Sequence, residues 1–254
     1  MRMFFLLVTM ILLPFQAVAQ ETEIDLKAAE IVTRAAEYLV IQPRFSFNWF
    51  VSLDEVRDDS EKVTYIRSGE TLMSRGNGFV SHSERDGTLR DFYYDGAEFT
   101  VASPNEGFYT NMPFTGGFDS LVDTVREYTG TILPLWSLMS DTLADGLLDD
   151  VEKGSYLGET LIAGSPVHHL AFTGENEDWQ IWISTDDTRP LPLMIVGTEK
   201  NEVGWPQYRV YMTDWNLDPA TDQAMFRFVP GENDTRVSMP VQIPPSGDGE
   251  TTGN

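Results

Sequence analysis

Short alternating segments separated by turns dominate this chain and constrain its fold more than any other feature. Turn signals rich in Gly, Asn, Asp and Pro recur about every 8 to 12 residues between residues 44 and 114, and an Asp95–Gly96 pair separates two alternating runs. Connections this short leave no room for crossover helices, so neighbouring strands must be antiparallel. The sequence therefore predicts a meander of about six strands, followed by about five more strands between residues 156 and 214.

Helical periodicity interrupts the strands in two places. Residues 21–42 carry apolar side chains at alternating spacings of four and three, and Pro43 ends the pattern. Residues 116–151 return to this period, with a leucine-rich stretch that is typical of a helix over residues 135–148. We therefore expect an N-terminal helix and an inserted helical lid.

The order of these elements indicates the fold class. Helix, strands, helices and strands again are typical of an α+β protein with an antiparallel sheet. A long antiparallel sheet closes, splits or curls, and the inserted helices could lie in the concave side of a curled sheet. We expect a curved half-barrel of about 11 strands in a single domain, residues 20–240.

Both ends of the chain differ in composition from this domain. Arg2 precedes an apolar stretch at residues 4–15, and an Ala-Val-Ala motif ends at Ala19, which is the layout of a secretory signal peptide. That stretch is shorter than the roughly 20 residues a membrane span needs. We expect export with cleavage after Ala19, and a disordered acidic tail over residues 241–254.

Charge and the lack of cysteine exclude several classes of function. The chain has 40 acidic and 17 basic residues, a net charge of −23. Such a surface repels nucleic-acid backbones and anionic lipid headgroups, so we expect no nucleic-acid partner and no stable membrane insertion. Without cysteine the chain can form neither disulfides nor thiolate metal sites, and it cannot carry a lipid on an N-terminal cysteine.

Motifs for catalysis or metal binding are weak. His168 and His169 are adjacent in a predicted strand, so they point to opposite faces and cannot easily share one ion. A calcium-loop-like motif begins at Asp214, but Pro219 stands where such a loop needs glycine. The chain contains none of the common serine-nucleophile or zinc-protease motifs. We therefore expect no catalytic site, no bound metal and no cofactor.

Several segments carry a resemblance to a known family. In chain order, the segments "YYDGAEFTVASPNEGFYTN", "SPVHHLAF", "DWQIWIS", "RPLPLMIV" and "YRVYMTDWNL" resemble a family of predicted exported bacterial proteins related to the LolA/LolB lipoprotein carriers. The resemblance extends from about Ala28 to Phe228. It implies a periplasmic protein with an incomplete, strongly curved antiparallel half-barrel and helices across its mouth. The residues that carriers use for partner contacts have no match in this sequence.

An apolar volume between the sheet and its lid is the main candidate site. Burying an acyl chain gains about 0.8 kcal/mol per CH₂, so about 14 carbons supply on the order of 10 kcal/mol before ordering costs. The hypothesis is a binding or carrier protein, not an enzyme, for an acyl chain, a lipid or a lipidated partner. Candidate wall residues are Phe92, Phe99, Val101, Leu170, Phe172, Trp179, Ile181 and Ile183. Candidate lid residues are Leu135, Trp136, Met139, Leu143 and Leu147.

Two alternatives remain open at this point. Each apolar residue alone is more often plain core than ligand contact, so the hollow could be filled by its own side chains. The protein would then be a structural or interaction module that docks a partner through its sheet edges. A hydrolase with an unusual site is the third hypothesis. The strand faces themselves are uncertain, because a one-residue slip would turn every candidate wall residue outward.

Overall fold

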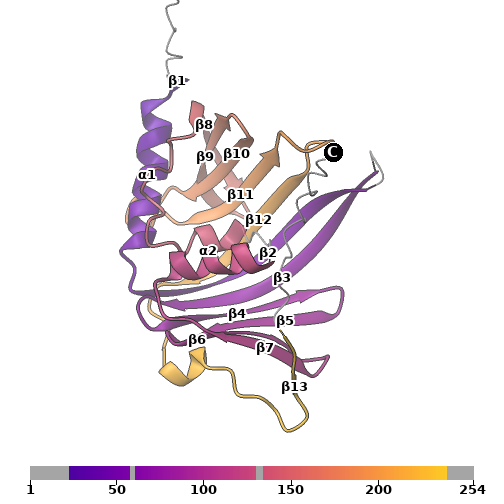
Figure 1. The fold of residues 1–254 in the computed structure, drawn as a ribbon. Helices are drawn as coiled ribbons and strands as arrows, with labels where there is room; N and C mark the ends of the chain where they lie inside the picture. Colours follow the sequence, from indigo (N-terminus) through magenta and orange to yellow (C-terminus); the bar gives the residue numbers. More distant parts are fainter. Residues whose placement is uncertain (1–22, 58–60, 130–133, 239–254) are drawn as a thin grey trace, which may run out of the picture.

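The computed structural model describes residues 23–57, 61–129 and 134–238 (Figure 1). The expected signal peptide, with cleavage after Ala19, and the expected tail at residues 241–254 lie outside this part of the chain. Within it, no helix combines the length and apolarity that a membrane span requires.

A single thirteen-stranded sheet makes up most of the fold (Figure 1). Its spatial order is β1-β8-β9-β10-β11-β12-β2-β3-β4-β5-β6-β7-β13. The strands are β1 (Glu23–Ile24), β2 (Arg44–Arg57), β3 (Glu61–Ser74), β4 (Gly78–Arg85), β5 (Thr88–Tyr94), β6 (Glu98–Ser103), β7 (Phe108–Pro113), β8 (Val151–Ile162), β9 (Ser165–Gly174), β10 (Glu177–Ser184), β11 (Pro192–Glu199), β12 (Gln207–Asn216) and β13 (Thr235–Arg236). The helices are α1 (Leu26–Val40), α2 (Phe118–Thr129), α3 (Pro134–Ser137) and the 3₁₀ turn η1 (Gln223–Phe226).

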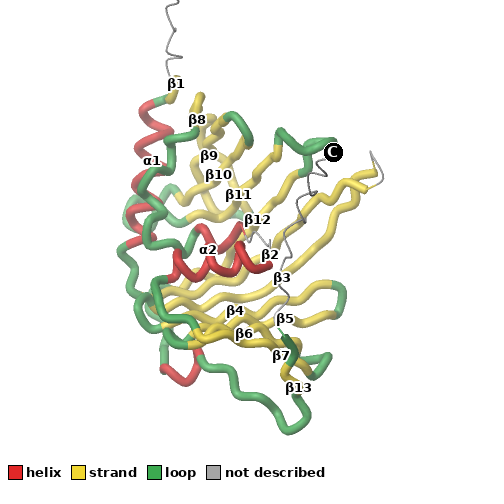
Figure 2. Tube along the Cα trace, in the orientation of Figure 1, coloured by secondary structure: helices red, strands yellow, loops and turns green. Residues whose placement is uncertain are grey.

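The sheet consists of two meanders joined side by side. Strands β2 to β7 pair in sequence order, as do β8 to β12, and both sets were expected as meanders. The join is the antiparallel pair β12–β2, in which Val210 lies opposite Val51. The two-residue strands β1 and β13 extend the outer edges in parallel with β8 and β7. The described sheet therefore stays open and curls around the helices (Figure 2).

The fold class differs from the α+β expectation. The described part of the protein is mostly β, with few helices. Its sheet has thirteen strands where about 11 were expected, since β1 and β13 add one short strand at each edge. Phe226 is buried and lies in η1. Phe228 packs its ring on Tyr93 and Tyr109, with centroids 5.5 and 5.0 Å away.

The prediction of a helical lid over residues 135–148 is wrong. Helix α3 ends at Ser137, and ten residues of turns follow from Asp141. Thr142 donates from its backbone N–H to Oγ of Ser140 at 3.0 Å, and Gly146 has a φ of 68°. A side chain that bonds the nearby backbone, and a glycine in the left-handed region, both compete with helix continuation. Leu143 and Leu147 still line the hollow inside the sheet, but from turns.

Helix α1 begins at an Asp25 cap, whose carboxylate accepts a 2.8 Å bond from the Lys27 N–H. Its buried face packs on β8, β9 and β10. The contact forms one of two hydrophobic core clusters in the described structure, called here the second core cluster. Its buried members are Ala28, Ile31, Val32, Ala35, Val151, Leu170, Phe172, Ile181 and Ile183. The candidate wall residues of β9 and β10 therefore face the helix on the concave side, which fixes the strand faces.

Helix α2 lies across the concave side of the other meander (Figures 1 and 2). Phe118, Leu121 and Val125 are buried from the helix, as its predicted apolar face required. The first core cluster contains Phe45, Phe47, Trp49, Met73, Phe79, Tyr94, Phe99, Phe118, Leu121, Val125, Leu135, Trp136, Leu138, Met139, Val210 and Met212. Ile195 of β11 packs against both clusters, so it marks the boundary between them.

Candidate functional site

An apolar cavity of about 220 Å³ opens where the two core clusters meet. Helix α1 forms one wall with residues such as Val32 and Leu39. The turns after α3 form a second wall with Leu143 and Leu147, both only half-buried. Strands β10, β11 and β12 form the floor, to which β11 contributes Ile195. The cavity thus lies between a helix, a loop and the concave sheet.

The thirteen predicted site residues fall into three groups. Those that line the cavity are Leu143, Leu147, Trp179 and Ile181. Those in or against the first core cluster are Phe92, Phe99, Val101, Leu135, Trp136 and Met139. Those in the second cluster under α1 are Leu170, Phe172 and Ile183. The structure therefore brings a minority of them together around the hollow and packs the rest as core.

Trp136 shows why the lid segment, residues 135–148, is partly core. Its ring meets Phe79, Phe92 and Phe99 edge-on, at centroid distances of 5.4, 5.7 and 6.2 Å. The side chain is 5% exposed. Edge-to-face aromatic packing of this kind contributes beyond simple area burial. Trp136 therefore anchors the start of the lid segment to the sheet.

Sequence reasoning missed the α1 wall and part of the floor. Val32, Ala35, Ala36 and Leu39 line the cavity, although the helix face was interpreted only as core. The 3.6-residue period of α1 already contained this signal. Finding Ile195 required the strand order, because alternation along a strand does not say which strands lie next to it.

One end of the cavity is polar. The Tyr208 hydroxyl donates a 2.8 Å hydrogen bond to Oε1 of Glu177, and both residues line the cavity. Burial raises the pKa of Glu177, and the negative charges of Glu199 and Asp178 raise it further. Burial, followed by the Glu177 charge, also raises the pKa of Tyr208. This end can exchange hydrogen bonds with a ligand, but it disfavours a second carboxylate.

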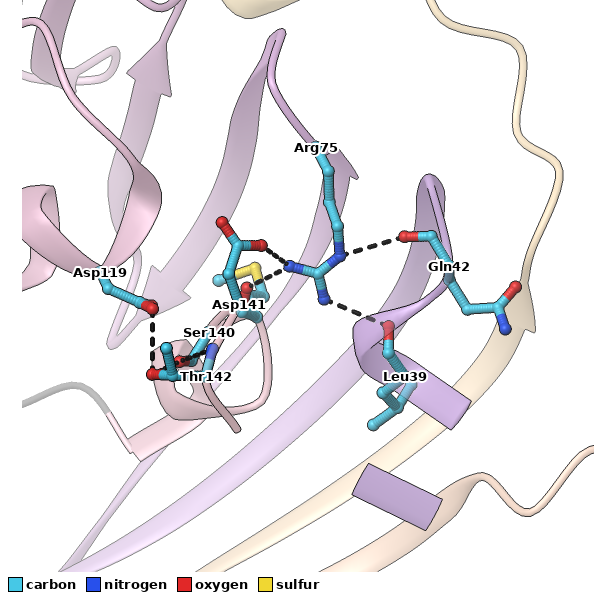
Figure 3. Close-up of polar contacts among 8 residues, drawn as sticks. Leu39, Gln42, Arg75, Asp119, Ser140, Asp141 and Thr142 are labelled. Atoms are coloured by element: carbon cyan, nitrogen blue, oxygen red, sulfur yellow. Dashed lines mark hydrogen bonds and ion pairs between the residues drawn. The ribbon is translucent and has the colours of Figure 1, made fainter. Parts of the chain in front are cut away.

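A single arginine connects the end of α1 with the turns after α3. Arg75, in the β3–β4 turn, donates to the carbonyls of Leu39 at 3.2 Å and Gln42 at 3.0 Å, at the end of α1 (Figure 3). It also donates to the Met139 carbonyl at 2.9 Å and pairs with Asp141. The guanidinium adds donors at a helix C-terminus, where carbonyls outnumber N–H groups, and the Leu39 carbonyl also accepts from the Gln42 N–H at 3.2 Å.

The lid segment has a second attachment on α2. The Thr142 hydroxyl donates to Oδ2 of Asp119 at 3.1 Å, beside its contact with Ser140 (Figure 3). Both partners are exposed, so this contact is weak compared with the Arg75 contacts. Release of Arg75 is therefore the main step that would free the segment from α1.

The histidines follow the predicted separation. His168 Nδ1 lies 3.2 Å from the Tyr156 hydroxyl, while His169 stacks on Trp182 with centroids 4.2 Å apart. Burial lowers the pKa of His168. Within the described part of the chain, no group of His, Asp and Glu side chains is arranged to hold a metal ion.

A second depression, of about 450 Å³, lies beside the β10–β11 loop and the end of β12. Its lining includes Asp186, Arg189 and Asp214, all charged. Asp186 accepts bonds from Thr188, whose hydroxyl and backbone N–H lie 2.7 and 2.9 Å away. These contacts are turn contacts, and apolar side chains such as Leu191 and Trp215 complete the lining. The cavity under α1 is the better candidate site because a helix, a loop and the concave sheet all contribute to its walls.

An open, curved sheet with helices in its hollow defines the half-barrel class to which the resemblance pointed. The chain belongs to the family described as "Predicted periplasmic protein (DUF2092)", whose model matches residues 28–239. This confirms the family and the periplasmic location that the sequence predicted.

Solved structures resemble the protein only loosely. The Mycobacterium tuberculosis lipoprotein LppX matches with a TM-score of 0.48 at 12% identity, covering 78% of this chain and 100% of that one. A LolA superfamily protein from Nitrosomonas europaea gives 0.36 at 12%, covering 79% and 97%. A chain of the Pseudomonas aeruginosa MucA/MucB complex gives 0.37 at 14%, covering 80% and 61%. Scores this low say nothing about what this chain binds, and no curated protein matches it in sequence.

Proposed function

We propose that this protein binds an acyl chain, or another slender apolar ligand, between α1, the turns after α3 and strands β10–β12. The observation that carries the proposal is the apolar cavity at the boundary of the two core clusters. Each cluster packs its own residues tightly, but Leu143 and Leu147 are left half-buried over the hollow between them. A binding or carrier role follows from this shape, and catalysis is not part of the proposal.

The size of the cavity implies that it must widen. Its volume of about 220 Å³ lies below the roughly 300–1,000 Å³ of sites that enclose a drug-sized ligand. The wall most able to move is the segment with Leu143 and Leu147, which is made of turns. Arg75 holds this segment to α1, so its release would enlarge the hollow.

The binding energy is sufficient for such an opening. Each buried CH₂ gains about 0.8 kcal/mol, so about ten methylenes supply roughly 8 kcal/mol. Breaking the Arg75 contacts with the lid segment costs about 3 kcal/mol, since hydrogen bonds to a charged group contribute about 1.5–3 kcal/mol each. The balance favours a closed empty state and an open occupied state.

Native mass spectrometry tests the proposal on protein purified without detergent from an exporting host, followed by solvent extraction. We expect a discrete added mass that is lost in a Leu143→Asp variant. The matched control is Leu161→Asp, because Leu161 is 64% exposed on β8 and does not line the cavity. A protein that stays free of ligand after incubation with fatty acids, phospholipids and a lipopeptide would contradict the proposal.

A second candidate function follows from the outer edge of β8. Among the residues that the structure describes, β1 pairs with this edge only at Lys153 and Gly154. Leu157 and Leu161 are 55% and 64% exposed farther along it. An uncovered edge can pair with another chain, although the bulge at Gly158 weakens that tendency. Light scattering tests pairing between copies: a dimer that a Leu157→Lys change converts to monomer would favour this function.

A further inference from the structure

Three arginines gather on the concave face at the hairpin end of the sheet, in a chain of net charge −23. Arg67 of β3 lies directly opposite Val51, which packs against the first core cluster, so Arg67 shares the concave face. Arg90 of β5 lies opposite Ser83 of β4, and Ser83 neighbours Gly69 on the same face.

Arg85 joins this group at the end of β4. It stands two residues beyond Ser83, so it points to the same side of the sheet. Its guanidinium lies 4.1 Å from the centre of the Tyr65 ring, two residues from Arg67 along β3. The three cations therefore come from three neighbouring strands and meet on one surface.

The charges of the three arginines are unequally compensated. Arg85 has Glu55 and Asp86 at 3.5 Å each, and Arg90 has Glu106 at 2.5 Å. Arg67 has no hydrogen bond or ion pair with any residue that the structure describes. Burial lowers the pKa of Arg67, and the charges of Arg85 and Arg90 lower it further. An arginine keeps its proton near neutral pH, so an anion bound beside Arg67 would relieve this repulsion.

An apolar row connects these arginines with the cavity. Residues paired across neighbouring strands share one face. The register shifts at Trp182/Ile183 and Thr213/Asn216 do not include any pair of the row described next. In order, the row is Ile181, Ile195, Val210, Val51 and Arg67. Ile181 and Ile195 line the cavity, so the row begins in the hollow and ends at the unpaired guanidinium.

We propose that Arg67, assisted by Arg85 and Arg90, binds a phosphate group, either free or as the head of an anionic amphiphile. The planar fork of a guanidinium matches two phosphate oxygens, which an ammonium cannot do. The amphiphile alternative, in which the apolar chain lies along the row towards the cavity, rests on the proposed function. The anion site itself stands on the arginine geometry alone.

Isothermal titration calorimetry tests the site with three probes. They are inorganic phosphate, lysophosphatidic acid below its micelle concentration, and lysophosphatidylcholine, whose phosphate carries a choline. Heat from inorganic phosphate supports a general phosphate site. Heat from lysophosphatidic acid alone supports an amphiphile whose head is a phosphate monoester. Equal binding of both lipids, or no binding of any probe, would overturn the proposal.

Three variants separate a site from a structural role. Arg67→Gln should weaken phosphate binding at least tenfold, and Arg67→Lys should weaken it by a smaller factor because the charge remains. Arg126→Gln is the matched control, since Arg126 is exposed on α2 and pairs with Asp123. The empty Arg67→Gln protein should melt at an equal or higher temperature than the wild type, because a repelled charge is gone. A lower melting temperature together with unchanged binding would show that Arg67 only supports the fold.

Discussion

The hydroxyl of Tyr208 donates a 2.8 Å hydrogen bond to Oε1 of Glu177 at the polar end of the cavity. The carboxyl is half-buried, and burial raises its pKa. A raised pKa in the folded state means that protonation favours folding. The stability contributed by this group is therefore fully present below the unfolded pKa of about 4.5 and declines as pH rises through the folded value.

A Glu177→Gln variant should remove this pH dependence, because Gln keeps the shape and stays neutral. We expect the variant to melt about 1 to 3 °C above the wild type at pH 7 and to show no gain near pH 4. Differential scanning calorimetry at several pH values measures the difference. Glu23→Gln, on an exposed residue of β1, is the control. If the difference in melting temperature between Glu177→Gln and the wild type grew towards acid pH, a raised pKa of Glu177 would be contradicted.

Arg75 should control the mobility of the lid segment. Replacing Arg75 with Gln removes its contacts with Leu39, Gln42 and Met139, and we expect a loss of about 3 kcal/mol in unfolding free energy. Hydrogen exchange of the amides in residues 137–147 should accelerate at least about tenfold.

Arg44→Gln is the control for the Arg75 variant, since Arg44 is 42% exposed and pairs with the exposed Asp218. Its unfolding free energy should change by less than about 1 kcal/mol. If both variants left exchange in residues 137–147 unchanged, Arg75 would not hold this segment.

Trp136 should behave as core and not as a ligand contact. Trp136→Ala removes the ring that meets Phe79, Phe92 and Phe99, and we expect a cost of about 3 to 5 kcal/mol in a denaturant titration. The same change at Trp205, which is 61% exposed, should cost less than about 1 kcal/mol. A small cost at Trp136 would return it to the candidate ligand contacts.

Gly69 should be intolerant of a side chain. A Cβ at this position would stand 2.1 Å from the His82 carbonyl oxygen and 2.5 Å from the Trp49 ring. Gly69→Ala should therefore destabilise the protein by about 1 to 3 kcal/mol. Gly117→Ala has open space around it and should be nearly neutral. Thermal melts of the two variants give the comparison, and equal melting temperatures would refute the close packing of Trp49 over β3.

Alternation along single strands predicted much of the fold. Phe172, Ile181 and Ile183 were placed on inward faces by their period of two, and the structure buries all three. The pairing of Val210 with Val51 could not be predicted, because a residue's period fixes its face but not its neighbour. The lid helix failed for a local reason: Ser140 and Gly146 favour turns over the helical spacing of the leucines.

The candidate site was only partly predictable for the same reasons. Leu143 and Leu147, which the spacing placed in the predicted lid, line the cavity from turns and not from a helix. The α1 wall and the grouping of Arg67 with Arg85 and Arg90 depend on which strands and helices lie side by side. Contacts of this kind emerge only once the register across several strands is known.

Photo-crosslinking with a diazirine-bearing fatty acyl probe, followed by peptide mass spectrometry, tests the central claim most directly. A ligand in the cavity should label peptides that contain Val32 or Leu39 of α1, Leu143 or Leu147 of the lid segment, and Ile195 of β11. An excess of unlabelled fatty acid should suppress this labelling. Labelling confined to the exposed Leu157 and Leu161 of β8, or labelling that competitor leaves unchanged, would contradict an acyl-binding cavity.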